Sequence, residues 1–164
     1  MKFISIIMGS KSDWDIMKEC VNILEKFYVP YEIIISSAHR SPKRTHDYVK
    51  DAELRGAKVF VAGAGMAAHL GGAIAANTTK PVIGVPLKGG ALDGLDALLS
   101  TVQMPAGMPV ATLAMGKAGA INAAYLAMQI LALEDEDLRA KLLEDRVLKA
   151  KKVEIDSKEI EKFL

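Results

Sequence analysis

Residues 4–13 read Ile4-Ser5-Ile6-Ile7-Met8-Gly9-Ser10-Lys11-Ser12-Asp13. The β-branched run that ends at Gly9 predicts a buried strand. Apolar residues then recur at helical spacing as far as Phe27, and Pro30 is predicted to stop that helix. Ser12, with Asp15 three positions later, predicts a capping-box start for the helix. One strand, one loop and one helix therefore follow one another within the first 30 residues, which indicates an α/β fold.

The same alternation continues along the chain. Further strands are predicted at 31–36, 58–62, 81–85 and 109–113, and further helices at 41–55, 67–77, 92–102 and 118–133. Ser41-Pro42 starts the second helix, Gly56 ends it in a left-handed conformation, and Gly63-Ala64-Gly65 breaks the third strand. Repeated strand–helix units imply a parallel sheet with right-handed crossovers and helices on both faces.

Ligands of such sheets bind outside the carboxyl ends of the strands. The loops that follow Met8, Ser36, Ala62 and Val85 are therefore the predicted position of a site. Which residues of 88–91, after the fourth strand, close over that site is left open.

The length of 164 residues fits one compact domain, 1–164, in which about 134–164 form a C-terminal helical extension. The apolar residues of this tail do not form one narrow stripe; they are Leu138, Leu142, Leu143, Val147 and Leu148. That pattern predicts a helix that contacts more than one surface, for example a neighbouring subunit. A solvated terminal helix is the equally weighted alternative.

Composition argues against several classes of protein. Lys and Arg number 21 against 20 Asp and Glu, so no excess of positive charge favours a nucleic acid or membrane partner. No apolar run is long enough to span a bilayer, and the run at the start is too short for a signal peptide. A single cysteine, Cys20, excludes an internal disulfide and a cysteine-cluster metal site. We expect a cytoplasmic location and no metal.

Two of the predicted loops suit an anionic ligand. In Gly9–Asp13, two hydroxyls precede a helix N-terminus and Asp13 can accept hydrogen bonds from ribose, although a cap and a turn are the simpler explanation of this loop alone. In Ser36-Ser37-Ala38-His39-Arg40-Ser41-Pro42, a residue that titrates near neutral pH stands beside a fixed cation that grips phosphate. This second loop predicts proton transfer next to a phosphate-like group.

The third loop reads Gly63-Ala64-Gly65-Met66-Ala67-Ala68-His69, which does not complete a dinucleotide-binding fingerprint. Its small residues let the backbone approach a small ligand closely. His69 either faces that ligand or packs on its helix, and the sequence leaves both readings open. Cys20 is expected in the core and His46 on a helix surface.

Several of these segments together resemble one family, PurE, the 5-(carboxyamino)imidazole ribonucleotide mutases of class I. The segments are Met8-Gly9-Ser10-Lys11-Ser12-Asp13-Trp14, Ser37-Ala38-His39-Arg40, Gly63-Ala64-Gly65 through His69-Leu70, Gly94 to Pro105 and Pro109-Val110-Ala111-Thr112. The resemblance covers roughly residues 2–133 in register, and the last thirty or so residues match only in character.

The resemblance implies a flavodoxin-like three-layer αβα fold, a homo-octamer, and an isomerase that needs no cofactor. It implies that the carboxyl group moves from the exocyclic amine of the ribonucleotide to ring carbon 4, in purine biosynthesis. His39 would be the proton shuttle. The substrate-binding residues that it implies are Ser10, Ser12, Asp13, Ser37 and Arg40 at the ribose and phosphate, and Gly65 and His69 at the carboxylate.

Two positions depart from the family, and two alternative functions remain. Met66 stands where the family usually has glycine, and Gly71 where it usually has proline. Met66 is expected to narrow the pocket or to move its loop. The alternative reaction is direct carboxylation of aminoimidazole ribonucleotide with carbon dioxide. A non-catalytic flavodoxin-like module that binds a nucleotide or flavin is the alternative from another class.

Overall fold

The computed structural model describes residues 1–163, which divide into two compact units at Met128 and Gln129. The strands are β1 (Phe3–Met8), β2 (Tyr31–Ile35), β3 (Ala57–Gly65), β4 (Val82–Leu87) and β5 (Ala111–Thr112). The helices are η1 (Lys11–Asp13, a 3-10 turn), α1 (Trp14–Lys26), α2 (Pro42–Arg55), α3 (Leu70–Ala75), α4 (Leu95–Val102), α5 (Gly116–Leu131) and α6 (Glu136–Ile160).

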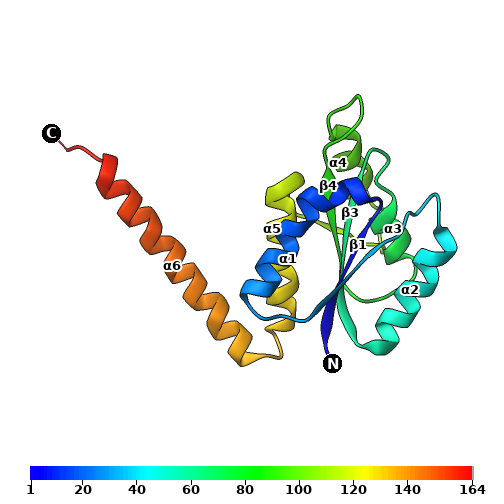
Figure 1. Ribbon diagram of the computed structural model, residues 1–164, viewed down its shortest axis with the longest axis horizontal. Helices are drawn as coiled ribbons and strands as arrows, with labels where there is room; N and C mark the ends of the chain where they lie inside the picture. Colours follow the sequence, from blue (N-terminus) through cyan, green and yellow to red (C-terminus); the bar gives the residue numbers. More distant parts are fainter. Residues whose placement is uncertain (164) are drawn as a thin grey trace. The chain divides into compact units, whose positions relative to one another are not determined.

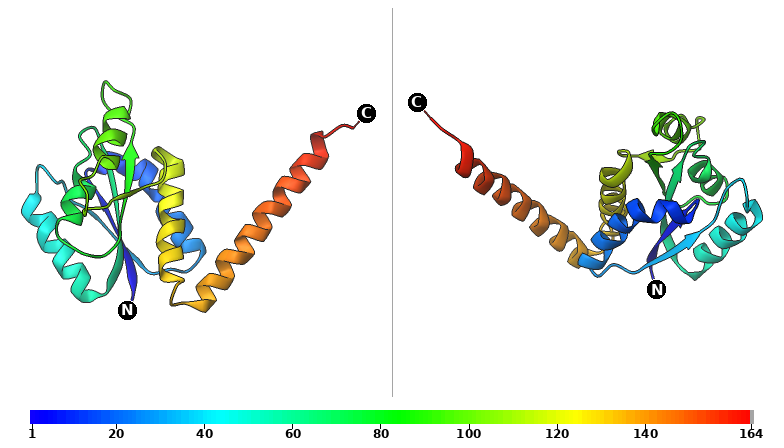
Figure 2. Two further views of the ribbon diagram at one scale, coloured as in Figure 1. Left: turned by 180° about the vertical axis from the view of Figure 1, so that it is seen from behind. Right: turned by 45° about the horizontal axis from the view of Figure 1, so that its top comes forward.

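The five strands form one parallel sheet in the order β2-β1-β3-β4-β5. Helices α1 and α5 cover one face, and α2 and α3 cover the other (Figures 1 and 2). The ring of Phe27, at the end of α1, meets Tyr125 of α5 edge-on at 5.9 Å. On the opposite face, Phe60 and Ile74 are fully buried in an apolar cluster. The predicted α/β sandwich with a central parallel sheet is confirmed.

Strand β3 is longer than the sequence suggested. Gly63-Ala64-Gly65 was predicted to break it, but these residues pair with Val85, Pro86 and Leu87 of β4. β4 itself runs two residues past the predicted end, through Pro86. A proline is tolerated there because β5 pairs with β4 only at Ile83 and Gly84, so no neighbour on that side needs the missing N–H.

The start and end of α1 differ from the prediction for local reasons. The 3-10 turn precedes the helix, and its capping pair is Ser10 with Asp13 rather than Ser12 with Asp15. The backbone N–H of Ser10 donates to Asp13 Oδ2 at 2.8 Å. The helix ends at Lys26, before Pro30, because Tyr28 takes a left-handed φ of 57°.

Helix α2 has the predicted bounds and α3 does not. Ser41 is the N-cap residue of α2, and Gly56 ends it at φ 113°. The Ser41 hydroxyl, however, accepts the N–H of Ser37 at 2.9 Å and makes no cap bond to the helix. α3 has only six residues instead of the predicted eleven.

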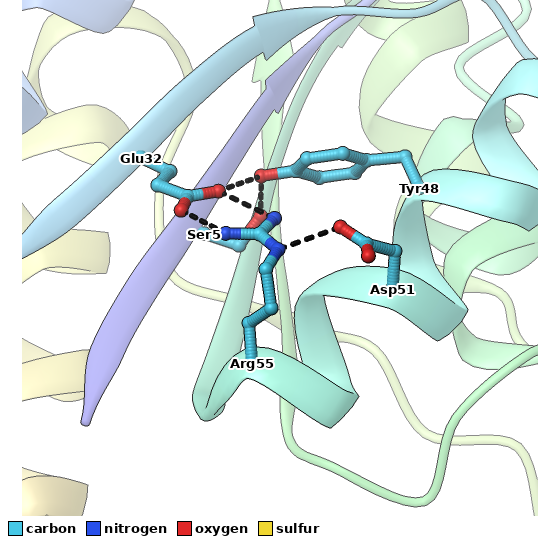
Figure 3. Close-up of polar contacts among 5 residues, drawn as sticks. All are labelled: Ser5, Glu32, Tyr48, Asp51 and Arg55. Atoms are coloured by element: carbon cyan, nitrogen blue, oxygen red, sulfur yellow. Dashed lines mark hydrogen bonds and ion pairs between the residues drawn. The ribbon is translucent and has the colours of Figure 1, made fainter. Parts of the chain in front are cut away.

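A polar cluster fixes α2 against β1 and β2 (Figure 3). Arg55, in the last turn of α2, binds both carboxylate oxygens of Glu32 and also Asp51 Oδ2, the last at 2.6 Å. Tyr48 donates to Glu32 at 3.2 Å and contacts the hydroxyl of buried Ser5 at 2.9 Å. The Arg55 guanidinium lowers the pKa of Glu32, whereas burial raises the pKa of Tyr48. This cluster holds the C-terminal half of a helix whose N-terminus follows the His39 loop.

The second unit, from Gln129, contains the end of α5 and the 25-residue helix α6. Asp135 caps α6 by accepting the N–H of Leu138 at 3.0 Å. Leu143, Val147 and Leu148 are each more than half exposed. The contact of this helix with a second surface and the solvated terminal helix both stay predictions. Across residues 1–163, no helix is both long enough and apolar enough to cross a bilayer.

Candidate active site

A cavity of about 580 Å³ lies at the carboxyl ends of β1 to β4, where the four predicted loops meet. All the site residues proposed from the sequence line it: Ser10, Ser12, Asp13, Ser37, His39, Arg40, Gly65 and His69. A parallel sheet forms such a site because all its strands end on one edge.

The first loop presents two hydroxyls and a carboxylate to the cavity. Ser10 and Ser12 lie with their hydroxyl oxygens 2.5 Å apart. Asp13 accepts the N–H of Ser10, and Gly9 donates its own N–H to the carbonyl of Gly63 at 3.1 Å. Burial raises the pKa of Asp13, and hydrogen bonds from Ser10 and Gly9 and the charge of Arg40 oppose that rise. The loop therefore carries a partly desolvated acid beside a pair of hydroxyls.

The second loop is built on hydroxyl contacts. Ser37 accepts the N–H of Arg40 at 3.1 Å, and Ser41 accepts the N–H of Ser37. Behind them, the buried side chains of Ser36 and Thr45 are bonded at 2.8 Å. These contacts fix the turn that exposes His39 and Arg40 to the cavity.

Arg40 joins the first two loops. Its Nη2 donates to the carbonyl of Gly9 at 3.1 Å, across 31 positions of sequence. Most of the guanidinium's five donors are not used by this one bond, and a planar guanidinium matches the oxygens of a phosphate. Arg40 thus places a fixed positive charge beside the hydroxyls of the first loop.

His39 and His69 form a direct pair. His39 Nε2 lies 2.7 Å from His69 Nδ1, and the two rings meet edge-on with centroids 4.8 Å apart. One ring nitrogen must carry the proton and the other must accept it. His69 therefore faces the cavity, which answers the question that the sequence left open. A proton can be held between the two rings or passed from one to the other.

Met66 lines the cavity from the third loop. Met66 has a left-handed φ of 53°, which a glycine adopts without strain. Its side chain lies against Gly90, where an added Cβ would stand 3.4 to 3.8 Å from the side-chain atoms of Met66. Met66 therefore lines the cavity, and the narrowing expected from its side chain stays a prediction. Its loop keeps the backbone conformation that glycine would favour.

Of residues 88–91, whose role the sequence left open, Lys88, Gly89 and Gly90 line the cavity and Ala91 does not. Lys88 forms an ion pair with Asp93 at 2.9 Å and adds a second cation to the cavity wall. Lys88 directly follows β4, and the position of a cation at the carboxyl end of a strand was the sequence signal that could have assigned Lys88 to the site.

Two residues set aside from the sequence lie away from the cavity. Cys20 is fully buried, and burial raises the pKa of its thiol to about 12, so it does not supply a thiolate. His46 bonds Asn77 Oδ1 at 2.6 Å. Among residues 1–163, no three His, Cys, Asp or Glu side chains gather as a metal-binding group.

Comparison with known proteins adds a family to this geometry. The family model described as AIR carboxylase matches residues 3–152. A relative from Bacillus subtilis, named N5-carboxyaminoimidazole ribonucleotide mutase, is 57% identical over 143 residues, which are 87% of this chain and 88% of the relative. A relative from Pyrococcus horikoshii with the same name is 54% identical over 98% of this chain and 89% of its own length.

Solved structures agree with the sequence relatives. The crystal structure of Treponema denticola PurE has a TM-score of 0.89 to this chain at 25% identity. The match covers 99% of this chain and all of the other. A crystal structure of a PurE2 variant from the same organism has a TM-score of 0.90 at 26% identity, with the same coverage.

Proposed function

This chain belongs to the AIR carboxylase family, and we propose that it is an N5-carboxyaminoimidazole ribonucleotide mutase of purine biosynthesis. Relatives of more than 50% identity over most of the chain carry that name. The observation that carries the proposal is the His39–His69 pair beside Arg40, inside one cavity. The reaction needs a group that gives and takes a proton next to a bound ribonucleotide.

The ribose and phosphate would bind along the first two loops. Adjacent hydroxyls of Ser10 and Ser12 and the guanidinium of Arg40 offer donors to phosphate oxygens. Asp13 offers a carboxylate to ribose hydroxyls, and Ser37 would complete this side of the cavity. A cavity of about 580 Å³ is within the usual range for a small-molecule site.

The proposed chemistry is a carboxyl transfer through carbon dioxide. The bond from the exocyclic nitrogen to the carboxyl carbon breaks, and the nitrogen receives a proton from His39. Carbon 4 of the imidazole then attacks the trapped carbon dioxide, and His39 takes up the proton that carbon 4 loses. His39 gives one proton to the nitrogen and regains one from carbon 4, so no further reactant is required. A general acid–base of this kind contributes about 10²–10⁴-fold.

The third loop would retain the carbon dioxide between the two steps. Gly65 and the alanines around it have little side chain, so the ring and the gas can lie close to the backbone. Holding both reactants in one small volume makes the second step effectively unimolecular. His69, bonded to His39, would border the carboxylate and orient the shuttling ring.

The homo-octamer and the cytoplasmic location remain part of the proposal. Helix α4 and the turn before it expose apolar side chains at helical spacing, Leu92, Leu95, Leu99 and Val102, each 47% to 60% exposed. Such a stripe supports a contact between subunits. The mass of the purified chain in light scattering tests the octamer.

The proposal predicts that His39→Asn loses turnover and keeps nucleotide binding. The rate of the coupled reaction should fall by about 10²–10⁴-fold, because asparagine cannot exchange a proton near neutral pH. His46→Asn, which changes the histidine away from the cavity, is the matched control and should retain normal turnover.

The wild-type assay separates the alternatives. The carboxyamino substrate is compared with aminoimidazole ribonucleotide plus bicarbonate in the same coupled system. Preference for the second pair would establish a direct carboxylase. If neither substrate is converted while the nucleotide still binds, the chain is a binding module. A yellow colour of the purified protein would then identify flavin as its ligand. Near-normal turnover by His39→Asn would remove His39 from the mechanism.

A further inference from the structure

The loop that carries His69 is held by a side chain from α4, a helix that follows it about 30 residues later in the sequence. The backbone N–H of Ala68, directly before His69, donates to the hydroxyl of Ser100 in α4 at 2.9 Å. Ala68 is buried, with 2% of its surface exposed. A buried N–H needs a partner, so this bond constrains where the loop can lie. Ser100 itself is not among the residues that line the cavity.

A second contact of Ser100 leaves its lone pairs free to accept this N–H. Its hydroxyl donates to the carbonyl of Asp96, one turn earlier in α4, at 2.7 Å. A hydroxyl has one proton and two lone pairs. Because the proton goes to Asp96, a lone pair faces Ala68, and the hydroxyl acts as an acceptor there.

The held amide lies in a segment with little conformational freedom. Met66, two residues before it, is left-handed, and His69 donates its own N–H to the carbonyl of Ala67 at 2.9 Å. The carbonyl of His69 then accepts the N–H of Ala73 in the first turn of α3. A shift at Ala68 is therefore passed to the backbone of His69.

We propose that Ser100 is a positioning residue that, by holding the Ala68 amide, keeps His69 in hydrogen-bond contact with His39. The inference rests on the proposed mutase function, in which His39 moves the proton. It assigns a role in the reaction to α4, a helix that contributes no residue to the cavity wall. The contact between the two histidines spans 2.7 Å, so a small displacement of one ring breaks it.

Replacing Ser100 by alanine removes the acceptor and leaves the Ala68 amide buried without its partner. The loop then has to move to find another partner. A misplacement of about 1 Å in a reacting group can cost on the order of 10²-fold in rate. Ser100→Ala is therefore expected to lower kcat by about ten- to a hundredfold, with KM changed less than about threefold.

Two further variants separate positioning from general damage to α4. Ser100→Thr keeps a hydroxyl that can bond both the helix carbonyl and Ala68, so it should restore most of kcat. Thr101→Val is the matched control, because Thr101 also bonds a carbonyl of its own helix, that of Ala97 at 2.7 Å. Loss of that hydroxyl should leave kcat within about twofold. If Ser100→Ala does not fold, Ser100→Cys, with a weak acceptor, takes its place.

A spectroscopic readout tests the positioning without turnover. The chain has three histidines, so the ring nitrogens of ¹⁵N-histidine-labelled protein give few resonances to assign. In Ser100→Ala those of His39 and His69 should shift and those of His46 should not. Ser100→Thr should return them towards the wild-type positions.

Unchanged His39 and His69 resonances in Ser100→Ala, or an unchanged kcat, overturn the proposal. So does an equal loss of kcat in Thr101→Val. If the wild-type chain converts neither substrate, the mutase function fails, and the resonances alone then decide whether Ser100 positions the histidine pair.

Discussion

Gly63→Ala is expected to destabilise the protein by about 1–3 kcal/mol, because the new methyl group has no room. A Cβ at Gly63 would lie 2.5 Å from Met17 Sδ and 2.7 Å from its Cγ. Contacts between such atoms are ordinarily about 3.5–4.0 Å. Met17 is fully buried in α1, so it cannot swing into solvent. The clash must displace either its rotamer or the helix.

The strand cannot give way easily either. Gly63 is in register with Met8 of β1, and its carbonyl accepts the N–H of Gly9. The strain should therefore be passed to α1 and to the first loop of the cavity. Each kcal/mol lost should lower the melting temperature by about 2–4 °C in a chain of this size.

Urea unfolding followed by circular dichroism measures the change, at one protein concentration because association changes apparent stability. Gly89→Ala is the control, since a Cβ there meets nothing within 4 Å, and its free energy of unfolding should stay within about 0.5 kcal/mol. In a Met17→Ala background, Gly63→Ala should cost at least about 1 kcal/mol less than in the wild type. A cost that is unchanged in that background, or absent in the wild type, would refute the steric argument.

Two more predictions concern the cavity wall. Met66→Ala should be about 1 kcal/mol less stable than Met66→Gly, because any Cβ is strained at φ 53° and glycine is not; equal urea midpoints would contradict this. Burial raises the pKa of Asp13, so the folded state holds that proton more tightly than the unfolded chain. The stability of the wild type relative to Asp13→Asn should therefore fall as pH rises from the ordinary value of 3.8 through the folded pKa. A pH-independent difference between the two unfolding curves would count against it.

The order of strands and helices could be predicted from the sequence because it rests on local signals. Apolar periodicity, Ser41-Pro42 at the start of α2 and Gly56 at its end act within a few residues of themselves. The predicted loops were also those that meet at the cavity, because parallel strands end on one edge. The family followed from several such segments in order.

The strand boundaries that were wrong depended on neighbours distant in sequence, whereas the start of the first helix was missed for a local reason. Residues 63–65 are small and were predicted to break the third strand. They continue β3 because they pair with β4. The predicted end of the fourth strand at residue 85 was too early, because β5 pairs with β4 only at Ile83 and Gly84 and so leaves room for Pro86 in the strand. The capping pair lies two residues earlier than predicted because it caps the 3-10 turn η1, which precedes α1.

By itself, the sequence determined the α/β fold, the family and the chemical types that line the cavity, since each depends on residue identity and spacing. Only the tertiary structure decided how those groups meet. It brought His39 onto His69 across 30 positions, Arg40 onto the Gly9 carbonyl across 31, and the Ser100 hydroxyl onto the Ala68 amide across 32. A hydrogen bond depends on a few tenths of an ångström between its atoms, and packing of whole helices on the sheet sets that distance.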